Sequence, residues 1–460
     1  MEMVNEAETK SEAWELAREL VRIDSSDPGA YEKEIGEFVY GWLRGRILEA
    51  GLEADERDEA GVGAESHPES ACGGGAGNCK DAAESAESGA GRGAEGRASR
   101  GAVAAADRKT GKILLCRREA LPGRYNVMAR IPGEKPGPAL TFICHMDTVM
   151  LGDGWDEARP ALGAVTENGR LYGRGACDMK SGLACALTAF SGILKKVGQG
   201  MRPVRPLVFI GTVDEEDFMR GVEAAIRWGW ATGEDWYLDT EPTDGQIQVA
   251  HKGRLWFELT MEGITAHASN PWKGADAIAA MAEAVSLIRR RIKDCPAHHD
   301  LGISTVTFGQ IEGGYRPYVV PDRCRVWIDM RLVPPTDTAA AKRIMDEAVR
   351  TAEAEIPGVK GNYVVTGDRP YVEKDDQSPL LAALRRAALG VTGREAEVGS
   401  FNGYTDTAVI AGTLGNKNCM SYGPGSLELA HKPNESVPFE DVRRCGKVLG
   451  RLAEDVVFGN

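Results

Sequence analysis

Short, almost continuously apolar runs that alternate with a helical stretch constrain the fold of this chain most strongly. The first run, Ala139–Cys144, reads ALTFIC, and the second, Leu207–Val213, reads LVFIGTV. Such runs are typical of parallel strands that are buried on both faces. Leu183–Leu194 has helical periodicity, and Trp236–Leu238 is typical of a third, shorter strand. The alternation predicts an α/β fold with a doubly wound sheet, in which ligands bind beyond the carboxyl ends of the strands.

The rest of the chain divides by its periodicity. Two amphipathic helices are predicted near the N-terminus, a β-α-β-β pattern follows Lys252, and α/β character returns near Pro379. We therefore predict a larger domain made from residues 1–251 and 369–460, with a smaller α+β domain inserted at 252–368. The predicted helices are Ala13–Ile23, Tyr31–Ala50, Ala275–Ile292 and Leu380–Leu389, and the predicted strands of the smaller domain are Leu255–Met261, Ser304–Phe308, Arg325–Arg331 and Asn362–Thr366.

A low-complexity segment at 57–110 interrupts the larger domain. It consists mostly of Gly, Ala, Ser and Glu with scattered Arg. Such a segment buries too little apolar surface to offset its ordering entropy, so we predict a disordered insertion. Its His67, Cys72 and Cys79 match none of the usual zinc-ligand spacings, and we assign them no function.

Charge and cysteine content limit the partners and the compartment. The 55 basic and 69 acidic residues leave a net charge of −14, which disfavours nucleic acid and anionic lipid as partners. The ten cysteines form no Cys-x-x-Cys pair and several lie in apolar runs, as reduced thiols of a cytoplasmic protein do. We predict neither a signal peptide nor a membrane span.

The first segment that carries chemistry is Cys144-His145-Met146-Asp147, at the end of a predicted strand. A histidine there can ligate a metal through one ring nitrogen. Because residues two apart point to the same side of an extended chain, Asp147 could accept a hydrogen bond from the other nitrogen. The alternative is an ordinary capped strand end.

The second segment, Gly173–Gly182, reads GRGACDMKSG and places Asp178 just before a helix. Glycines on both sides let the backbone approach a ligand closely. The alternative is helix capping, for which Asp178 or Ser181 would serve well.

The third segment, Asp214–Asp217, places four acids directly after an apolar strand. Adjacent side chains point in opposite directions, so one metal ligand and one general base is a natural division between Glu215 and Glu216. A solvated acidic loop is the alternative. Glu241 in Glu241-Pro242-Thr243 and His431 in Ala430-His431-Lys432 are, taken singly, typical of surface loops.

Together these segments resemble one family of zinc-dependent metallopeptidases and amidohydrolases, which includes acetylornithine deacetylase, succinyl-diaminopimelate desuccinylase, aminoacylase and carboxypeptidase G. The matching text is HMDTV, GRGACDMKSG, DEE, EPT, AHAS, TD (Thr405-Asp406) and GPG followed by AHKPNE, in the family's order. The resemblance covers nearly the whole chain outside the low-complexity segment, and it is greatest to the deacetylase and desuccinylase branch.

The resemblance implies a site with two divalent metal ions, zinc with cobalt or manganese as alternatives. Carried over by motif, Asp178 would bridge the two ions. His145 and Glu241 would complete the ligand set of one ion, and Glu216 and His431 would complete the set of the other. The larger domain would be catalytic.

Three further residues receive roles from the resemblance. Asp147 would orient His145, and Glu215 would be the general base. The inserted domain would be a ferredoxin-like lid or dimerisation domain of a homodimer, and its His267 would stabilise the oxyanion in the site of the partner subunit. The alternative for His267 is an ordinary turn residue.

The implied reaction is hydrolysis of an amide bond in N-acyl amino acids or small peptides, as in a deacetylase or desuccinylase. A dipeptidase or carboxypeptidase of the same family is the alternative. A metal-binding homologue without catalysis is disfavoured by the presence of Glu215, which only proton transfer requires. A two-metal phosphodiesterase would need a basic groove, which the charge balance does not support.

One position departs from the family. An Asn that often precedes a Val-Pro stretch in the smaller domain is here Tyr318, which puts inherited substrate specificity in doubt. Arg316 or Arg331 could bind a substrate carboxylate, but we favour a strand ion pair for Arg331. Of the remaining histidines, we expect His251 to be structural, and His298 and His299 to be solvated.

Overall fold

The computed structural model describes residues 11–59, 112–401 and 403–459, which form two compact units. Unit 1 comprises Met1–Gly245, Ala382–Glu395 and Tyr422–Asn460, and unit 2 comprises Gln246–Leu381 and Ala396–Ser421. The predicted domain boundaries at 252 and 368 stay a prediction.

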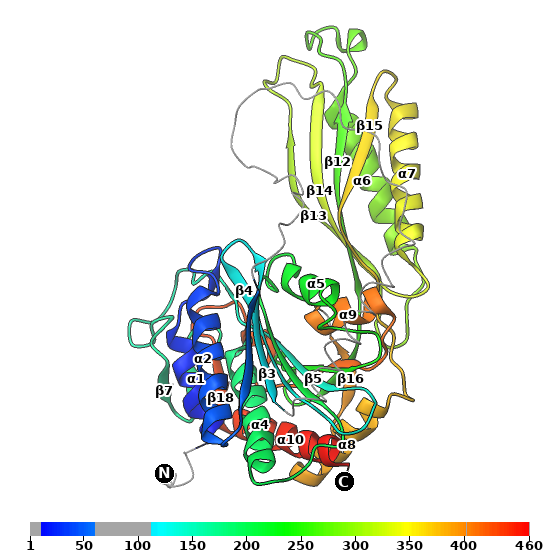
Figure 1. Cartoon of the computed structure of the whole chain (residues 1–460). Helices are drawn as coiled ribbons and strands as arrows, with labels where there is room; N and C mark the ends of the chain where they lie inside the picture. Colours follow the sequence, from blue (N-terminus) through cyan, green and yellow to red (C-terminus); the bar gives the residue numbers. More distant parts are fainter. Residues whose placement is uncertain (1–10, 60–111, 402, 460) are drawn as a thin grey trace. The chain divides into compact units, whose positions relative to one another are not determined.

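A mixed sheet forms the centre of unit 1 (Figure 1). Its strands lie in the order β10-β5-β9-β4-β3-β2. β5 runs parallel to β9 and β10, whereas β4 is antiparallel to both β9 and β3, so the predicted doubly wound sheet is not purely parallel. The reason is the tight turn between β3 and β4, where Gly123 adopts a φ of 73°. The bounds are β2 Ala54–Glu59, β3 Ile113–Leu121, β4 Arg124–Ile131, β5 Leu140–His145, β9 Leu207–Thr212 and β10 Trp236–Asp239.

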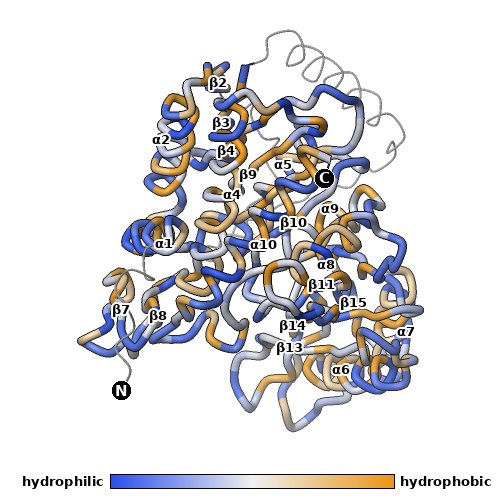
Figure 2. The backbone as a smooth tube through the Cα atoms, turned by 90° about the horizontal axis from the view of Figure 1, so that it is seen from below, coloured by the Kyte–Doolittle hydropathy of each residue, from blue (hydrophilic) through white to orange (hydrophobic). Residues whose placement is uncertain are grey.

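Helices bury the faces of this sheet, as the apolar runs predict. Every residue of β5 and β9 is buried, and most of β9 is coloured hydrophobic in Figure 2. α4 contacts both strands and also packs against α1 and α10, while α2 contacts β3 and β4. The helices are α1 Glu12–Arg22, α2 Lys33–Glu49, α4 Lys180–Gly198, α5 Arg220–Arg227 and α10 Phe439–Phe458.

Unit 1 also contains two small sheets apart from the main one. β1 pairs in parallel with β6, and a small antiparallel sheet has the order β18-β8-β7. Their bounds are β1 Ser26–Asp27, β6 Thr148–Val149, β7 Val165–Glu167, β8 Arg170–Tyr172 and β18 Ser436–Pro438.

Unit 2 contains an antiparallel sheet of the order β13-β14-β12-β15, with α6 and α7 side by side on one face (Figure 1). The element order is β-α-β-β-α-β, so the predicted β-α-β-β pattern missed α7. Alternate residues of β12 and β14 are buried, which explains why the periodicity identified these strands. The bounds are β12 Gly253–Glu262, α6 Ala277–Lys293, β13 Thr305–Gly313, β14 Arg323–Leu332, α7 Thr338–Glu355 and β15 Lys360–Arg369.

Three further strands of unit 2 pair through β11. β11 is parallel to β16 and antiparallel to β17, and α8 crosses the boundary between the two units in the sequence. The bounds are β11 Ile247–His251, η1 Pro271–Lys273, α8 Pro379–Thr392, β16 Val398–Phe401, α9 Asp406–Leu414 and β17 Cys419–Ser421, and unit 1 adds η2 Leu427–Leu429.

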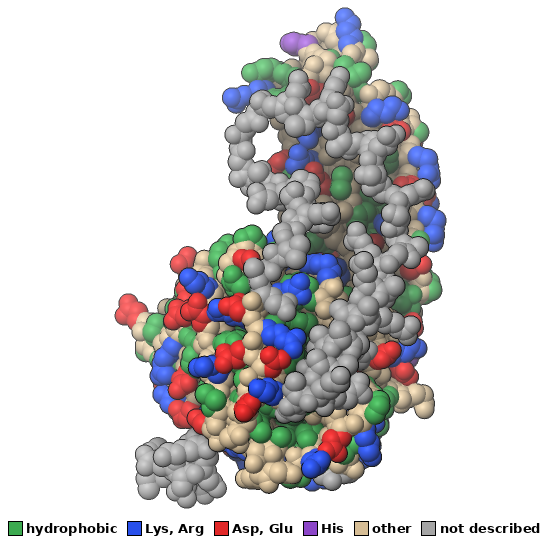
Figure 3. Space-filling view, in the orientation of Figure 1, with side chains coloured by type: hydrophobic (Ala, Val, Ile, Leu, Met, Phe, Trp, Pro, Cys, Tyr) green, Lys and Arg blue, Asp and Glu red, His purple; other side chains and the backbone are tan. Residues whose placement is uncertain are grey.

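The first three residues of the predicted insertion, Arg57–Glu59, belong to β2, which pairs in parallel with β3. The rest of the insertion, with His67, Cys72 and Cys79, lies outside the described residues. The eight described cysteines are all free thiols, and all but Cys295 are buried. Within the described ranges, no helix has both the length and the apolar character that crossing a membrane requires. On the face drawn in Figure 3, acidic and basic side chains are interspersed.

Candidate metal centre

The carboxyl ends of three strands in unit 1 bring acids and a histidine to one edge of the sheet. His145 is the last residue of β5 and pairs in register with Thr212 at the end of β9. Because β10, β5 and β9 are parallel, the acids that follow β9 and β10 lie at the same edge as His145. The structure therefore gathers residues that are far apart in the sequence.

Asp178 lies between the two predicted ligand sets. Its Oδ1 is 3.2 Å from Nε2 of His145, and its Oδ2 is 3.4 Å from Nε2 of His431. Nε2 of His145 is also 3.7 Å from Oε1 of Glu241, and Nε2 of His431 is 3.0 Å from Oε2 of Glu216. Each oxygen of Asp178 thus faces a different histidine, and each histidine has one further carboxylate beside it.

Glu215 joins the same group. One of its carboxylate oxygens lies within 4.8 Å of ligand atoms of His145 and Glu241, and a second group with the same limit contains His145, Asp178 and Glu216. Glu215 is 8% exposed. We name His145, Asp178, Glu215, Glu216, Glu241 and His431 the carboxylate–histidine cluster.

The electrostatics of the cluster reflect an excess of buried acid. Burial raises the pKa of Glu241 well above its ordinary value and also raises that of Glu216, and the negative charge of Asp178 adds to both. Burial alone would raise the pKa of Asp178, but hydrogen bonds from His145 and His431 outweigh it and hold this pKa low. Hydrogen bonds to Asp178 and Glu216 raise the pKa of His431 to about 10. Four carboxylates around two imidazoles form a donor set of nitrogen and oxygen that fits two divalent cations.

Asp147 lies beside Nδ1 of His145, and its nearest atom there is the backbone carbonyl oxygen and not the carboxylate. Nδ1 of His145 is 3.0 Å from the backbone carbonyl oxygen of Asp147, whereas its distance to the carboxylate oxygen Oδ1 is 3.7 Å. The Oδ2 atom of Asp147 instead accepts a hydrogen bond from the backbone N–H of Glu216, at 3.0 Å. The carbonyl is thus the nearer acceptor for the His145 ring, and the carboxylate of Asp147 holds the acidic loop after β9.

The loop that carries Asp178 is held by residues to which the sequence analysis gave no role. The carboxylate of Glu435 accepts hydrogen bonds from the backbone N–H groups of Cys177 and Asp178, at 2.8 and 3.0 Å, and pairs with Arg174 at 2.7 Å. Arg174 lies in the motif GRGACDMKSG and Glu435 in AHKPNE. Their presence in these motifs is the feature of the sequence that could have identified them. The helix-capping alternative does not hold, because Met179 is the N-cap of α4 and no side chain caps it.

Two glycines allow the backbone before Glu241 to fit closely. A Cβ on Gly423 would lie 2.2 and 2.4 Å from the carbonyl oxygens of Thr240 and Glu241, and a Cβ on Gly182 would lie 2.2 Å from the same Thr240 oxygen. Real Cβ atoms do not approach oxygen so closely, so side chains here would displace the segment that carries Glu241.

His267 lies in unit 2, whereas the six residues of the carboxylate–histidine cluster lie in unit 1. His267 is exposed, and its Nδ1 is 2.8 Å from the hydroxyl of Ser269. The backbone of this turn pairs with the segment that contains Tyr318, because the N–H of Ala268 donates to the carbonyl oxygen of Tyr318 at 3.1 Å. Tyr318 is 62% exposed. Arg331 pairs with Asp329 in β14 at 2.8 Å, which confirms the predicted strand ion pair.

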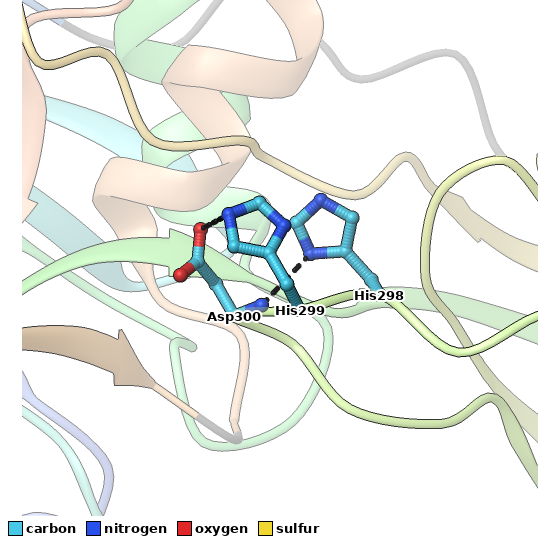
Figure 4. Close-up of side chains that lie close together, drawn as sticks. All are labelled: His298, His299 and Asp300. Atoms are coloured by element: carbon cyan, nitrogen blue, oxygen red, sulfur yellow. Dashed lines mark hydrogen bonds and ion pairs between the residues drawn. The ribbon is translucent and has the colours of Figure 1, made fainter.

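A second group of possible ligands, His298, His299 and Asp300, lies in a hairpin of unit 2 (Figure 4). Nδ1 of His298 accepts from the backbone N–H groups of Asp300 and Leu301, and Nε2 of His299 pairs with Asp300 at 2.9 Å. The side chain of His299 is 80% exposed and that of His298 15% exposed. The exposure of His299 agrees with the predicted solvation, whereas His298 is mostly covered.

A model of one family matches more than half of the chain: peptidase family M20/M25/M40, at residues 141–455. Acetylornithine deacetylase from Myxococcus xanthus is 27% identical over 338 residues, which cover 71% of this chain and 83% of that protein.

Solved structures show the same fold. A tripeptidase from Staphylococcus aureus has a TM-score of 0.61 at 22% identity, covering 77% of this chain and 91% of that one. A Bacillus subtilis protein, described as a dinuclear metal-binding peptidase of family M20, has a TM-score of 0.62 at 15% identity and covers 97% of both chains. The likeness at these identities concerns the fold alone.

Proposed function

This chain belongs to peptidase family M20/M25/M40 and is a hydrolase of that family, and we propose that it uses two metal ions to cut an amide bond in N-acyl amino acids or small peptides. The observation that carries the proposal is the position of Asp178, whose two oxygens face His145 and His431 separately. That arrangement suits a carboxylate shared by two cations.

The donor set supports the choice of metal. Asp178 would be shared, His145 and Glu241 would hold one ion, and Glu216 and His431 would hold the other. When bound, two zinc ions, or cobalt or manganese in their place, would polarise the scissile carbonyl and lower the pKa of water to about 7.

The protein's own residues supply orientation and proton transfer. Glu215 lies beside His145 and Glu241 without being needed in either proposed ligand pair. It would accept the proton of the attacking water and return it to the nitrogen of the leaving amine. The backbone carbonyl of Asp147 holds Nδ1 of His145, which leaves Nε2 directed toward Asp178.

A deacylase of N-acyl amino acids is the preferred activity, because the curated relative named above is an acetylornithine deacetylase. A dipeptidase or carboxypeptidase is the alternative, which the fold shared with a tripeptidase supports. We further propose a homodimer, with the α+β sheet of unit 2 as a lid or dimerisation domain and with His267 acting in the partner's site. A cytoplasmic location agrees with the buried free thiols.

The experiment that tests the proposal combines metal analysis with a hydrolysis panel. Purified protein loaded with zinc or cobalt is offered N-acetyl and N-succinyl amino acids beside dipeptides. We expect two metal equivalents and turnover of at least one acyl amino acid or peptide. Failure to take up zinc, cobalt or manganese would remove the proposal, whereas metal uptake without any hydrolysis would indicate a non-catalytic homologue.

The role of Glu215 has its own test. Glu215→Gln should retain both metal equivalents but lower kcat by on the order of 10²–10⁴-fold, because the base that moves the proton is lost. Glu19→Gln, on the exposed side of α1, is the control and should behave as wild type. Unchanged turnover in Glu215→Gln would show that another group is the base.

A further inference from the structure

A single buried cation lies among acids from three separate segments of unit 1. Nε of Arg124, the first residue of β4, donates to Oε2 of Glu32 at 2.6 Å. Its Nη2 donates to Oδ2 of Asp27 at 2.7 Å, and its Nη1 lies 3.2 Å from Oδ1 of Asp214. The side chains of Glu32 and Asp214 are fully buried, and that of Arg124 is 10% exposed. We name these four residues the Arg124 network.

The Arg124 network contains three acids and only one cation, so its positive charge is smaller than the negative charge of its acids when all are ionised. A carboxylate oxygen of Asp147 lies within 4.8 Å of oxygens of Asp27 and Glu32. Burial raises the pKa of Glu32 to about 7, even though the hydrogen bond with Arg124 acts in the opposite direction. Removing Arg124 would leave buried carboxylates facing one another, and such groups separate or take up protons when their counter-ion is lost.

Asp214 connects this network to the carboxylate–histidine cluster. It has a φ of 67°, the left-handed conformation that residues with a Cβ rarely adopt. Its backbone N–H donates to Oε1 of Glu32 at 2.9 Å, and its Oδ2 accepts from Nε of Arg220 at 2.6 Å. The turn at Asp214 is therefore held from outside the loop, through both its backbone and its side chain.

The two residues after Asp214 are Glu215 and Glu216, the proposed base and a proposed metal ligand. The backbone N–H of Glu216 also donates to Asp147, and the Glu216 side chain pairs with His431. A rotation at Asp214 would displace both glutamates together, since they follow it directly in the chain.

We propose that Arg124 is a positioning residue, which holds Asp214 in its left-handed conformation and thereby sets the places of Glu215 and Glu216. The inference rests on the proposed function, because Glu215 is the proposed base and Glu216 a proposed metal ligand. Arg124 would support both from outside the site. Arg124 itself would not contact the substrate.

The test compares Arg124→Met and Arg124→Lys with the wild-type full chain, by zinc calorimetry and by kcat and KM on the best substrate of the hydrolysis panel. We expect Arg124→Met to lose roughly 10–100-fold in zinc affinity and in kcat, as removal of a residue that supports metal ligands does. Arg124→Lys should lose less, because the charge remains while the two-pronged hydrogen bonding is lost. KM should change less than kcat.

Arg46→Met is the matched control. Arg46 also pairs with two acids, Glu12 at 2.9 Å and Glu49 at 2.7 Å, but it lies on α2 away from the Arg124 network. The control should keep wild-type zinc affinity and kcat, even if its thermal midpoint falls slightly.

Zinc affinity separates this proposal from the proposed function, since it can be measured without any turnover. A folded Arg124→Met variant with wild-type zinc affinity and kcat, and only a lower thermal midpoint, would overturn the positioning role and leave a structural one. If Arg124→Met does not fold, Glu32→Gln decides, because it keeps the shape of Glu32 and removes its charge. We expect weaker zinc binding there as well, and unchanged binding would overturn the proposal.

Discussion

The charge state of a buried side chain in this protein depends on the groups that hydrogen-bond to it. Asp178 stays ionised against the effect of burial, because His145 and His431 hydrogen-bond its two oxygens. Burial has the opposite outcome for His251, which is 1% exposed in β11 and whose pKa it lowers. Its ring lies 5.8 Å from that of Phe401 and 6.1 Å from that of Tyr404.

The burial of His251 predicts a dependence of stability on pH. Burial lowers the pKa of His251 from 6.5 to about 4, so between these values the unfolded chain binds a proton that the folded protein does not. The contribution of the neutral ring is complete above pH 6.5 and is lost as the pH falls toward 4. At full extent the loss is on the order of 3 kcal/mol in the free energy of unfolding.

Urea unfolding of wild type and His251→Phe at several pH values measures this effect. The difference in unfolding free energy between the two proteins should shift in favour of the variant as the pH falls from 6.5 to 4. A difference that is constant over this range would show that His251 is not a buried neutral histidine.

At the scale of elements, α4 contains one glycine that could be replaced by a larger residue without a clash and one that could not. A Cβ on Gly192 meets no atom within 4 Å, whereas a Cβ on Gly182 meets the carbonyl oxygen of Thr240 at 2.2 Å. Thr240 follows β10 and directly precedes Glu241. The close approach of α4 to this segment therefore fixes the position of a proposed metal ligand.

Alanine at these two glycines should have opposite effects. Gly192→Ala should raise the free energy of unfolding by about 1 kcal/mol, because alanine is the better helix former. Gly182→Ala should lower it by about 1–3 kcal/mol through overpacking, and should weaken zinc binding by moving Glu241. Urea unfolding and zinc calorimetry measure both. A stabilised Gly182→Ala with normal zinc binding would show that α4 can move away from Thr240 freely.

At the scale of the whole molecule, unit 1 contains the carboxylate–histidine cluster and unit 2 contains His267. His267 is exposed in unit 2, and its Nδ1 lies within hydrogen-bond distance of the hydroxyl and the backbone N–H of Ser269. In the proposed homodimer it would stabilise the oxyanion in the partner's site. Loss of one such donor lowers kcat by on the order of 10²–10³-fold.

Mixing two inactive variants tests this arrangement. Subunits carrying Glu215→Gln and subunits carrying His267→Ala are each expected to be nearly inactive. If His267 acts across the dimer, subunit exchange creates one complete site in each mixed dimer, and activity should return to roughly a quarter of wild type. Sedimentation should show dimers in all samples. Dimers that exchange subunits without regaining activity would place His267 in its own subunit's site.

Much of the fold was predictable, because a strand buried on both faces has a continuous apolar run and a strand buried on one face has alternating apolar residues. β5 and β9 were apparent from their unbroken apolar runs, and β12 and β14 from alternation. β3 and β4 carry arginines and polar residues within their length and were not predicted. The antiparallel position of β4 beside β9 follows from the β3–β4 turn, which the strand–helix alternation does not reveal.

The sequence by itself determined which residue types follow which strands, and parallel strands then bring their carboxyl ends to one edge. His145 and the Asp214–Asp217 segment could be placed in this way. Only the tertiary structure decided that Asp147 contacts the N–H of Glu216, that Glu435 holds the Asp178 loop, and that Arg124 faces Asp214. These pairs are brought together by the packing of whole elements, and local periodicity carries no record of which buried polar groups will meet.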